Sequence, residues 1–162
     1  MDRLKRASVA ALLHDLDRRS PAGCAIGLHV RFTTPRFMFQ SYPKRWMDQY
    51  SGSGLLVLDP TVHWGMNNVG WVRWQDLEPI DTHGVLERAK DYGLMNGVTI
   101  ALLSDGSRSI ASFARSDRDY EMSEISELEL AFGELHKTTA GVETLTDGDR
   151  LAFKDLSVRL TH

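Results

Sequence analysis

The sequence has few of the features that mark secreted, membrane-spanning or nucleic-acid-binding chains. It contains one cysteine, Cys24, so no intrachain disulfide can form, which fits a reducing cytoplasm. No apolar run approaches the roughly 20 residues that a membrane span requires. Basic residues are not in excess, because 19 Lys and Arg stand against 22 Asp and Glu and the net charge is -3. We therefore expect a cytoplasmic chain that has no membrane contact and does not bind DNA by itself.

The length and the apolar spacing predict one domain with long helices at both ends. A chain of 162 residues is large enough to bury a substantial core. An apolar residue at every third or fourth position predicts an amphipathic helix over about residues 3–19. Because charge flanks the apolar stretch and no cleavage site follows, this helix is not a signal peptide. The same spacing predicts a helix over residues 122–135 with an acidic outer face.

Three apolar stretches of the chain predict extended segments. Residues 26–32 alternate, which predicts a strand whose apolar face carries Ile26, Leu28, Val30 and Phe32. Residues 37–40 follow a turn and predict a second, antiparallel strand. The run Leu55–Leu58 is fully apolar, and we expect it to be an extended, buried approach to the residue that follows it.

The clearest hairpin signal lies at Asp105-Gly106, a pair typical of two-residue turns. If Ser104 pairs with Ser107, the register places Thr99 and Ser112 together on one face of the hairpin. Val98, Ile100 and Phe113 then share the opposite face. Since both faces are largely apolar, we expect helices to cover the sheet on both sides.

An unusual concentration of aromatic residues lies between positions 42 and 74. Tyr42, Trp46 and Tyr50 follow one another at i, i+4 and i+8, so on a helix they share a face. A plain core prefers aliphatic residues, because a buried indole N–H or phenol O–H needs a partner. Asp59-Pro60 predicts a helix start with Asp59 as N-cap. This combination suggests an apolar cavity in which a few polar groups orient one small molecule.

Each of these residues also has a structural explanation when it is taken singly. Trp46 could be a core aromatic, and Asp59 an ordinary helix cap. Ser112 could be a strand hydroxyl that bonds to neighbouring backbone. Asp59 and His63 stand at i and i+4, as metal ligands or an acid–base pair would, but no third ligand follows at a recognisable spacing. We therefore expect no metal and no cofactor.

Taken together, the residues resemble a known family. The pattern Tyr42-x3-Trp46-x3-Tyr50-x8-Asp59-Pro60, followed by Trp74 and by Tyr-Gly-Leu-Met-Asn-Gly-Val-Thr-Ile at 92–100, resembles the autoinducer-binding domain of LuxR-type quorum-sensing regulators. The resemblance implies an α+β fold, an α-β-α sandwich around an antiparallel sheet of about five strands. It also implies an N-acyl-homoserine lactone bound between the sheet and one helical layer.

The resemblance implies a role for each polar group around the ligand head. The residue that matches Trp46 donates to the lactone carbonyl, the one that matches Asp59 accepts the amide N–H, and the one that matches Tyr42 donates to the acyl carbonyl. The ligand offers two acceptors and one donor, so these partners are complementary. An analogue without the amide N–H would leave the buried carboxylate short of a partner, at a cost of about 1–3 kcal/mol.

Four further residues complete the predicted site. In the family, residues that match Tyr50 and Trp74 form walls around the head group. The position of Ser112 offers a polar contact to the acyl amide or its substituent, and the hairpin register places Thr99 on the same sheet face. Ligand contact and a purely structural hydroxyl both remain open for Ser112.

The resemblance covers residues 1–141 and predicts what the chain works with. Residues 142–162 are expected to be a linker and the start of a truncated or absent helix-turn-helix domain, since they are too few for a DNA-reading module. The expected partners are a small-molecule autoinducer and a second copy in a homodimer, with DNA contacted only through a C-terminal domain that this chain does not contain.

Three alternatives to this function stay open. The chain could be a receptor for another small amphipathic signal, or a dimerisation partner that titrates a full-length regulator. It could also be an enzyme that acts on an acyl amide or lactone. The sequence shows no activated nucleophile and no metal site, so the prediction is that it is not an enzyme.

Overall fold

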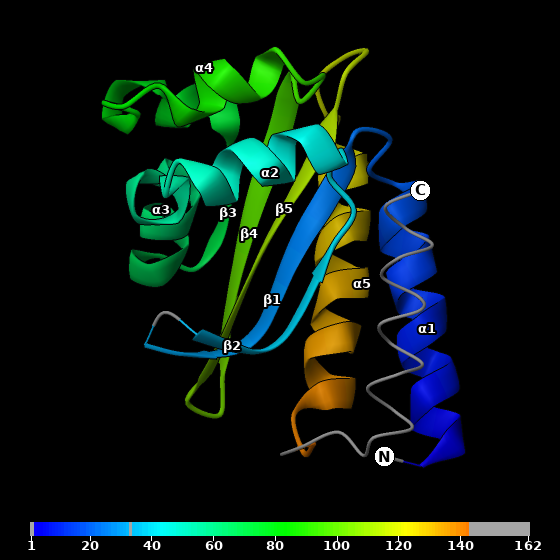
Figure 1. Ribbon diagram of the computed structural model, residues 1–162. Helices are drawn as coiled ribbons and strands as arrows, with labels where there is room; N and C mark the ends of the chain where they lie inside the picture. The colour runs from blue at the N-terminus through cyan, green and yellow to red at the C-terminus, as the bar shows by residue number, and fades with distance from the viewer. Residues whose placement is uncertain (1, 33, 143–162) are drawn as a thin grey trace.

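The computed structural model describes residues 2–32 and 34–142, which form one sheet with helices on both of its faces (Figure 1). The sheet has five antiparallel strands in the order β2-β1-β5-β4-β3. This arrangement confirms the predicted α-β-α sandwich. The strands are β1 (Gly23–Arg31), β2 (Thr34–Gln40), β3 (Gly70–Arg73), β4 (Asn96–Ser104) and β5 (Ser107–Arg115).

The central hairpin has the predicted register. Ser104 pairs with Ser107, and Asp105 and Gly106 both have positive φ, 51° and 73°, as a tight hairpin turn of the primed type requires. Thr99 therefore lies opposite Ser112. Because neighbouring residues of a strand point to opposite faces, the hairpin contributes one set of side chains to each helical layer.

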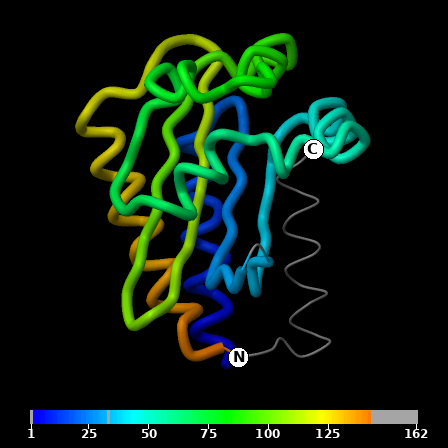
Figure 2. Tube along the Cα trace, turned by 90° about the vertical axis from the view of Figure 1, so that its left-hand side faces the viewer, coloured from blue at the N-terminus to red at the C-terminus, as the bar shows by residue number. Residues whose placement is uncertain are grey.

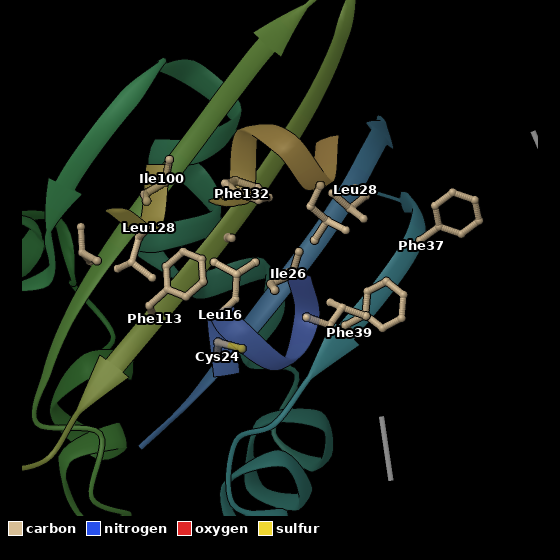
Figure 3. Packing of buried hydrophobic residues seen from close by; sticks show 14 of the residues in the cluster. Leu16, Cys24, Ile26, Leu28, Phe37, Phe39, Ile100, Phe113, Leu128 and Phe132 are labelled. Atoms are coloured by element: carbon tan, nitrogen blue, oxygen red, sulfur yellow. The ribbon is translucent and has the colours of Figure 1, made fainter. Parts of the chain in front are cut away.

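The two terminal helices cover one face of the sheet. They are α1 (Arg3–Arg18) and α5 (Met122–Thr139), which lie side by side in Figures 1 and 2. Between these helices and the sheet lies a dense core. Phe113 of β5 meets Phe132 of α5 edge to face, with ring centroids 6.2 Å apart. Figure 3 shows these rings packed among Leu16, Ile26 and Leu128.

The other face is covered by short elements, and Figure 2 looks onto this layer. A second, smaller apolar cluster lies beneath it and includes Trp46, Trp74 and Leu94. None of the helices in the described part of the chain has the length and apolarity that a bilayer span requires. The elements of this layer are α2 (Lys44–Gly52), η1 (Leu55–Leu58), α3 (Pro60–Asn67), η2 (Trp74–Ile80) and α4 (Val85–Lys90).

The expectation for Leu55–Leu58 is wrong. These residues form the short 3-10 helix η1 rather than an extended segment, and Leu55 is buried whereas Val57 is 71% exposed. The chain enters this turn through Gly54, whose φ of 64° is left-handed and costs glycine little. One turn of helix presents only part of its surface to the core, so a fully apolar run is not fully buried here.

Strand β1 departs from the predicted alternation after Leu28. A bulge lies between Gly27 and Val30, and His29 in it has a φ of 54°. An extra residue in a strand reverses the direction of the side chains that follow. His29 is consequently buried, Val30 lies on the face opposite to the expected one, and Phe32 is 86% exposed.

The predicted boundary near residue 141 stays a prediction. Helix α5 ends at Thr139, and Val142 packs back onto the core. The expected linker and start of a second domain, residues 142–162, lie outside the described residues from position 143 onward.

A pair of stacked histidines joins the β1 bulge to the C-terminal part of α5. The rings of His29 and His136 lie 4.5 Å apart, and both residues are buried. The His29 Nδ1 lies 2.6 Å from the Ser107 hydroxyl, and the His136 Nδ1 lies 2.6 Å from the Ser109 hydroxyl. Burial lowers the pKa of both imidazoles, since a charged ring would lose its hydration.

Neighbouring groups modify the effect of burial on each pKa. The His136 ring and Arg36 lower the pKa of His29 further, and the hydrogen bond to the His136 backbone oxygen acts in the opposite direction. For His136, Asp105 partly offsets the decrease. In the unfolded chain both rings return to an ordinary pKa of about 6.5. The folded protein therefore binds fewer protons than the unfolded chain below that pH.

We expect the free energy of unfolding to decrease as the pH falls from 7.5 to 5.5. The stabilisation from a neutral histidine is present above about pH 6.5 and is lost as the pH falls toward its lowered folded-state pKa, at no more than about 1.4 kcal/mol per pH unit for each ring. Urea unfolding at a series of pH values measures this slope. His136→Gln should make it shallower, whereas exposed His83→Gln should not; equal slopes in all three proteins would contradict the assignment.

Candidate functional site: a polar-headed apolar cavity

The aromatic residues of the α2 region pack together under the layer of short helices. Helix α2 begins at Lys44 with Pro43 as N-cap, so Tyr42 lies just before the helix rather than on it. Trp46 is 3% exposed and packs against Tyr50 and Tyr92, with ring centroids 5.8 and 5.3 Å away. The predicted helical spacing is thus only partly realised, yet all three predicted aromatics face one cavity.

The Asp59 carboxylate is buried at the start of α3, where it caps the helix as predicted. Its Oδ1 accepts hydrogen bonds from the backbone N–H of Thr61, at 2.9 Å, and from the Thr61 hydroxyl, at 2.7 Å. Its Oδ2 accepts one from the Tyr50 phenol at 2.8 Å. A carboxylate has about four acceptor positions, so these three bonds leave one for a further donor.

Burial dominates the electrostatics of this carboxylate. Asp59 is 8% exposed, and removal from water raises its pKa although its hydrogen bonds to Thr61 and Tyr50 act in the opposite direction. The two phenols nearby are affected in the same sense, because burial, with Asp59 as a further cause, raises the pKa of both Tyr42 and Tyr50. Both phenols therefore stay protonated and remain donors at neutral pH.

The Tyr42 phenol is held only weakly. It donates to the backbone carbonyl of Ser112 over 3.4 Å, which is long for a hydrogen bond between two oxygens. A better-placed acceptor in the cavity could therefore take over this donor.

A chain of hydrogen bonds links Trp74 to the sheet. The Trp74 indole donates to the Thr99 hydroxyl at 3.1 Å, and that hydroxyl lies 2.7 Å from the Ser112 hydroxyl. If the Thr99 hydroxyl donates this hydrogen bond to the Ser112 oxygen, the Ser112 O–H is free to donate into the cavity. Thr99 is fully buried and does not line the cavity, so its place is behind Trp74 and Ser112.

Gly97 makes room for this arrangement. A Cβ at Gly97 would lie 2.2 Å from the Trp74 ring, which shows that the indole lies flat against the glycine backbone. Gly97 belongs to the motif at 92–100, but the sequence analysis gave it no role, although a glycine inside a strand is itself a signal of close approach.

The cavity has a volume of about 170 Å³ and lies between the sheet and the short helices. Six of the seven predicted residues line it: Tyr42, Trp46, Tyr50, Asp59, Trp74 and Ser112. The rest of the lining is mainly apolar and was not predicted, because such residues have the same composition as an ordinary core. Examples are Val30, Met38, Val62, Met66, Leu86 and Ile110.

Thr61 is a polar lining residue that the sequence analysis missed. Its position two residues after an Asp N-cap was the available signal, because an N-cap side chain bonds to the N–H at that spacing. Its hydroxyl helps to hold Asp59 in one orientation.

The indole N–H of Trp46 differs from that of Trp74. Among residues 2–32 and 34–142, Trp46 Nε1 has no hydrogen-bond partner, whereas the Trp74 indole donates to Thr99. The Trp46 nitrogen keeps a small solvent-accessible surface. Since the residue lines the cavity and is otherwise buried, this N–H is a donor that a molecule in the cavity can use.

The metal and acid–base interpretation of Asp59 and His63 gains no support from the geometry. The His63 ring is exposed and its Nε2 lies 2.9 Å from the backbone oxygen of Val57, whereas Asp59 bonds to Thr61 and Tyr50. No three His, Cys, Asp or Glu side chains gather as potential metal ligands within the described part of the chain.

Tyr50→Phe should destabilise the domain by about 1–3 kcal/mol, because it removes a hydrogen bond to a buried carboxylate. Urea unfolding at pH 7 measures the change. Tyr92→Phe is the matched control: the Tyr92 hydroxyl has no hydrogen-bond partner among the described residues, so its loss should change stability by less than about 0.5 kcal/mol. Equal losses would show that the Tyr50–Asp59 bond contributes nothing beyond ring packing.

Comparison with known proteins assigns the chain to a family. Residues 24–138 match the family model described as the autoinducer binding domain. The transcriptional activator protein VanR of Vibrio anguillarum is 31% identical over 96 residues, covering 57% of this chain and 40% of that protein. The regulatory protein SdiA of Escherichia coli is 30% identical over 88 residues, covering 53% and 37%. The chain thus spans about 40% of the length of the curated relatives it matches.

Solved structures agree on the fold. A crystal structure of Escherichia coli SdiA superposes with a TM-score of 0.64 at 21% identity, covering 85% of this chain and 64% of that one. SdiA in complex with octanoyl-rac-glycerol gives a TM-score of 0.66 at 18% identity, covering 99% and 76%. The family match extends over most of the residues that build the sheet and both helical layers. The chain therefore belongs to the autoinducer binding domain family of LuxR-type quorum-sensing regulators.

Proposed function

We propose that this domain binds an N-acyl-homoserine lactone in the cavity between the sheet and the short helices, and that it acts as the sensor of a LuxR-type regulator. The observation that carries the proposal is the indole N–H of Trp46, which has no hydrogen-bond partner among residues 2–32 and 34–142 and lies in the same apolar cavity as the buried Asp59 carboxylate. A donor and a charged acceptor in one apolar hollow are poorly explained by packing alone, because each costs free energy unless it is satisfied.

The head of such a ligand matches the polar end of the cavity. The Trp46 indole would donate to the lactone carbonyl, and the remaining acceptor position of Asp59 would take the amide N–H. The Tyr42 phenol would exchange its 3.4 Å bond to the sheet for the acyl carbonyl. Each group then gains a partner that it lacks or holds weakly, which is the basis of specificity in a buried polar site.

The remaining predicted residues would shape and orient the head group. Tyr50 fixes Asp59 through their 2.8 Å bond, and Trp74, bonded to the sheet, presents its apolar ring as a wall. Ser112 offers a hydroxyl to the acyl carbonyl or to a substituent beside it. Thr99 would act indirectly by holding Trp74 and Ser112 in place.

A second amphipathic ligand has a specific argument in its favour. Escherichia coli SdiA, which shares this fold, has been solved in complex with octanoyl-rac-glycerol. A glycerol head carries hydroxyl donors that could satisfy Asp59 in place of an amide N–H. A monoacylglycerol therefore belongs beside the lactones in any binding experiment.

The proposal extends to how binding is transmitted. Filling the cavity stabilises the folded domain by mass action, and this would favour a cytoplasmic homodimer competent for transcription. DNA would be contacted through a helix-turn-helix domain, in a longer polypeptide or in a full-length partner regulator. The relatives named as transcriptional activators support this role.

A binding lactone should raise the melting temperature of the domain. At a free concentration of 100 times Kd, mass action contributes about 2.7 kcal/mol, which is about 5–10 °C for a domain of this size. Differential scanning fluorimetry with lactones of short and long acyl chains measures the shift. If none of them shifts melting while a monoacylglycerol does, the second ligand class is the correct one. Chromatography of the lactone before and after incubation tests turnover, which we expect to be absent.

Trp46→Phe should weaken lactone binding at least tenfold, because it removes a hydrogen bond to the ligand and leaves the ring in place. The matched control is Trp71→Phe, since Trp71 packs toward the other helical layer and does not line the cavity. Titration monitored by tryptophan fluorescence gives both affinities, and urea unfolding gives both stabilities. A loss of stability in Trp46→Phe without a separate loss of affinity would identify Trp46 as a packing residue only.

A further inference from the structure

The sheet side of the cavity is built in three rows. We use the term cavity floor for the residues of β5, β1 and β2 that line the cavity. The first row pairs Ser112 with Ala25, and the second pairs Ile110 with Gly27 and Met38. The third row consists of Val30 and Pro35, and Val30 pairs on its other side with Arg108, which does not itself line the cavity. The first row contains the polar Ser112, and the two rows beyond it present apolar lining residues to the cavity.

The cavity floor has the length of a medium acyl chain. Ser112 and Arg108 are four positions apart in β5, so the first and third rows lie about 13 Å apart at the usual strand rise. An extended alkyl chain advances about 1.3 Å per carbon, given a C–C bond of about 1.5 Å at a tetrahedral angle. A chain that begins beside Ser112 therefore reaches the third row with about ten carbons.

The far end of the cavity floor is fixed where the end of α3 meets β5. The Arg108 guanidinium donates to the backbone oxygens of Gly65 and Asn68, at 2.7 and 2.6 Å, and so ties these two elements together. The lining is nearer to solvent beside the second row, where Met38 is 52% exposed, and at Leu56 of η1, which is 50% exposed. Among the described residues of β1, β2 and β5, none beyond the third row lines the cavity, so a longer acyl chain gains no further contact with the floor.

Gly27 lies at the middle of the cavity floor, and the backbone does not require a glycine there. Its φ lies outside the left-handed region, and a Cβ would make ordinary contacts, 3.5 Å from the Ile110 oxygen and 3.5 Å from the Pro35 Cβ. The bulge that follows is accommodated by His29, which carries the positive φ. A glycine in the interior of a strand without a backbone reason marks a place where another group approaches closely.

We propose that Gly27 sets the acyl-length preference of this receptor. Resting on the proposed function, this inference adds that the missing side chain lets an acyl chain lie against the β1 backbone and continue to Val30 and Pro35. The preferred ligands then carry acyl chains of about eight to twelve carbons, because only these pass the second row and reach the third. Chains of four to six carbons end at or before Gly27 and leave the third row uncovered.

The test is a titration of the full chain with N-acyl-homoserine lactones of 4, 6, 8, 10 and 12 carbons, followed by tryptophan fluorescence. For the unsubstituted protein, affinity should rise by up to about fourfold per added methylene and level off near ten carbons. A flat series, or a preference for the four-carbon chain, would overturn the inference.

Gly27→Val should shorten the usable cavity floor. We expect the ten-carbon ligand to lose at least about tenfold in affinity, the equivalent of two methylene contacts, and the four-carbon ligand to change by less than about twofold. Gly27→Ala should give a smaller shift in the same direction, and it carries the test if the valine variant does not fold. Equal weakening of every chain length by Gly27→Val would contradict the assignment.

The control variant is Gly133→Ala. Gly133 lies in α5 in the opposite layer, with open space around its Cβ position, so the same chemical change should leave the whole series unaltered. Melting temperatures without ligand show whether each variant is folded.

A parallel series of monoacylglycerols with the same acyl lengths separates this inference from the proposed function. If lactones fail to bind but the glycerols show a length dependence that Gly27→Val removes, the length assignment holds and the lactone proposal fails. If Trp46→Phe weakens lactone binding but Gly27→Val affects all acyl lengths equally, the lactone proposal holds and the length assignment fails. Absence of binding in both series would overturn both.

Discussion

A buried carboxylate organises the ligand-facing half of this domain. Asp59 caps α3, receives two hydrogen bonds from Thr61 of that helix and one from Tyr50 of α2, and so connects the two helices. An ionised carboxylate in an apolar setting is tolerated only when its hydrogen bonds compensate for lost hydration. The positions of the short helices around it therefore depend on hydrogen bonds to this carboxylate as well as on hydrophobic burial.

The two faces of the sheet differ in how closely they are packed. On one side, two long helices and the sheet form a close-packed core that contains Phe113 and Phe132. On the other side, the aromatic and polar residues around Trp46 leave a cavity. Close packing gives the first side its stability, whereas the second gives up packing contacts around a space that a ligand can fill. A sensor needs this asymmetry, because a ligand stabilises the folded state only if the domain offers it a space to bind.

Much of the fold followed from local chemistry in the sequence. Asp105-Gly106 predicts the hairpin, and the register that follows from this turn correctly places Thr99 beside Ser112. Asp59-Pro60 likewise predicts the start of α3. These signals are strong because a turn depends on the φ values of its own residues and a cap on a side-chain bond to the next turn of helix, so both are local.

The failures came where distant parts of the chain decide the outcome. The His29 ring in the bulge lies within hydrogen-bonding distance of the Ser107 and Thr139 hydroxyls, which are distant in the chain. No local sequence pattern predicts the bulge. The run at Leu55 was interpreted as extended because composition cannot tell a short turn of helix from a strand. Among the site residues, the polar ones apart from Thr61 were found through spacing and resemblance, whereas the apolar lining could not be distinguished from ordinary core.

The shared sheet has a consequence for changing what the domain detects. Ser112 and Phe113 are adjacent in the chain but point into different layers, and the same holds for Gly27 and Leu28 on β1. Substitutions at the cavity-lining positions change the cavity and leave the residues of the opposite core in place, although on β1 these positions change parity at the bulge, after Gly27. Directed evolution toward new signals could therefore vary the cavity-facing positions of β1 and β5 and keep the core-facing positions constant, so that the fold is preserved.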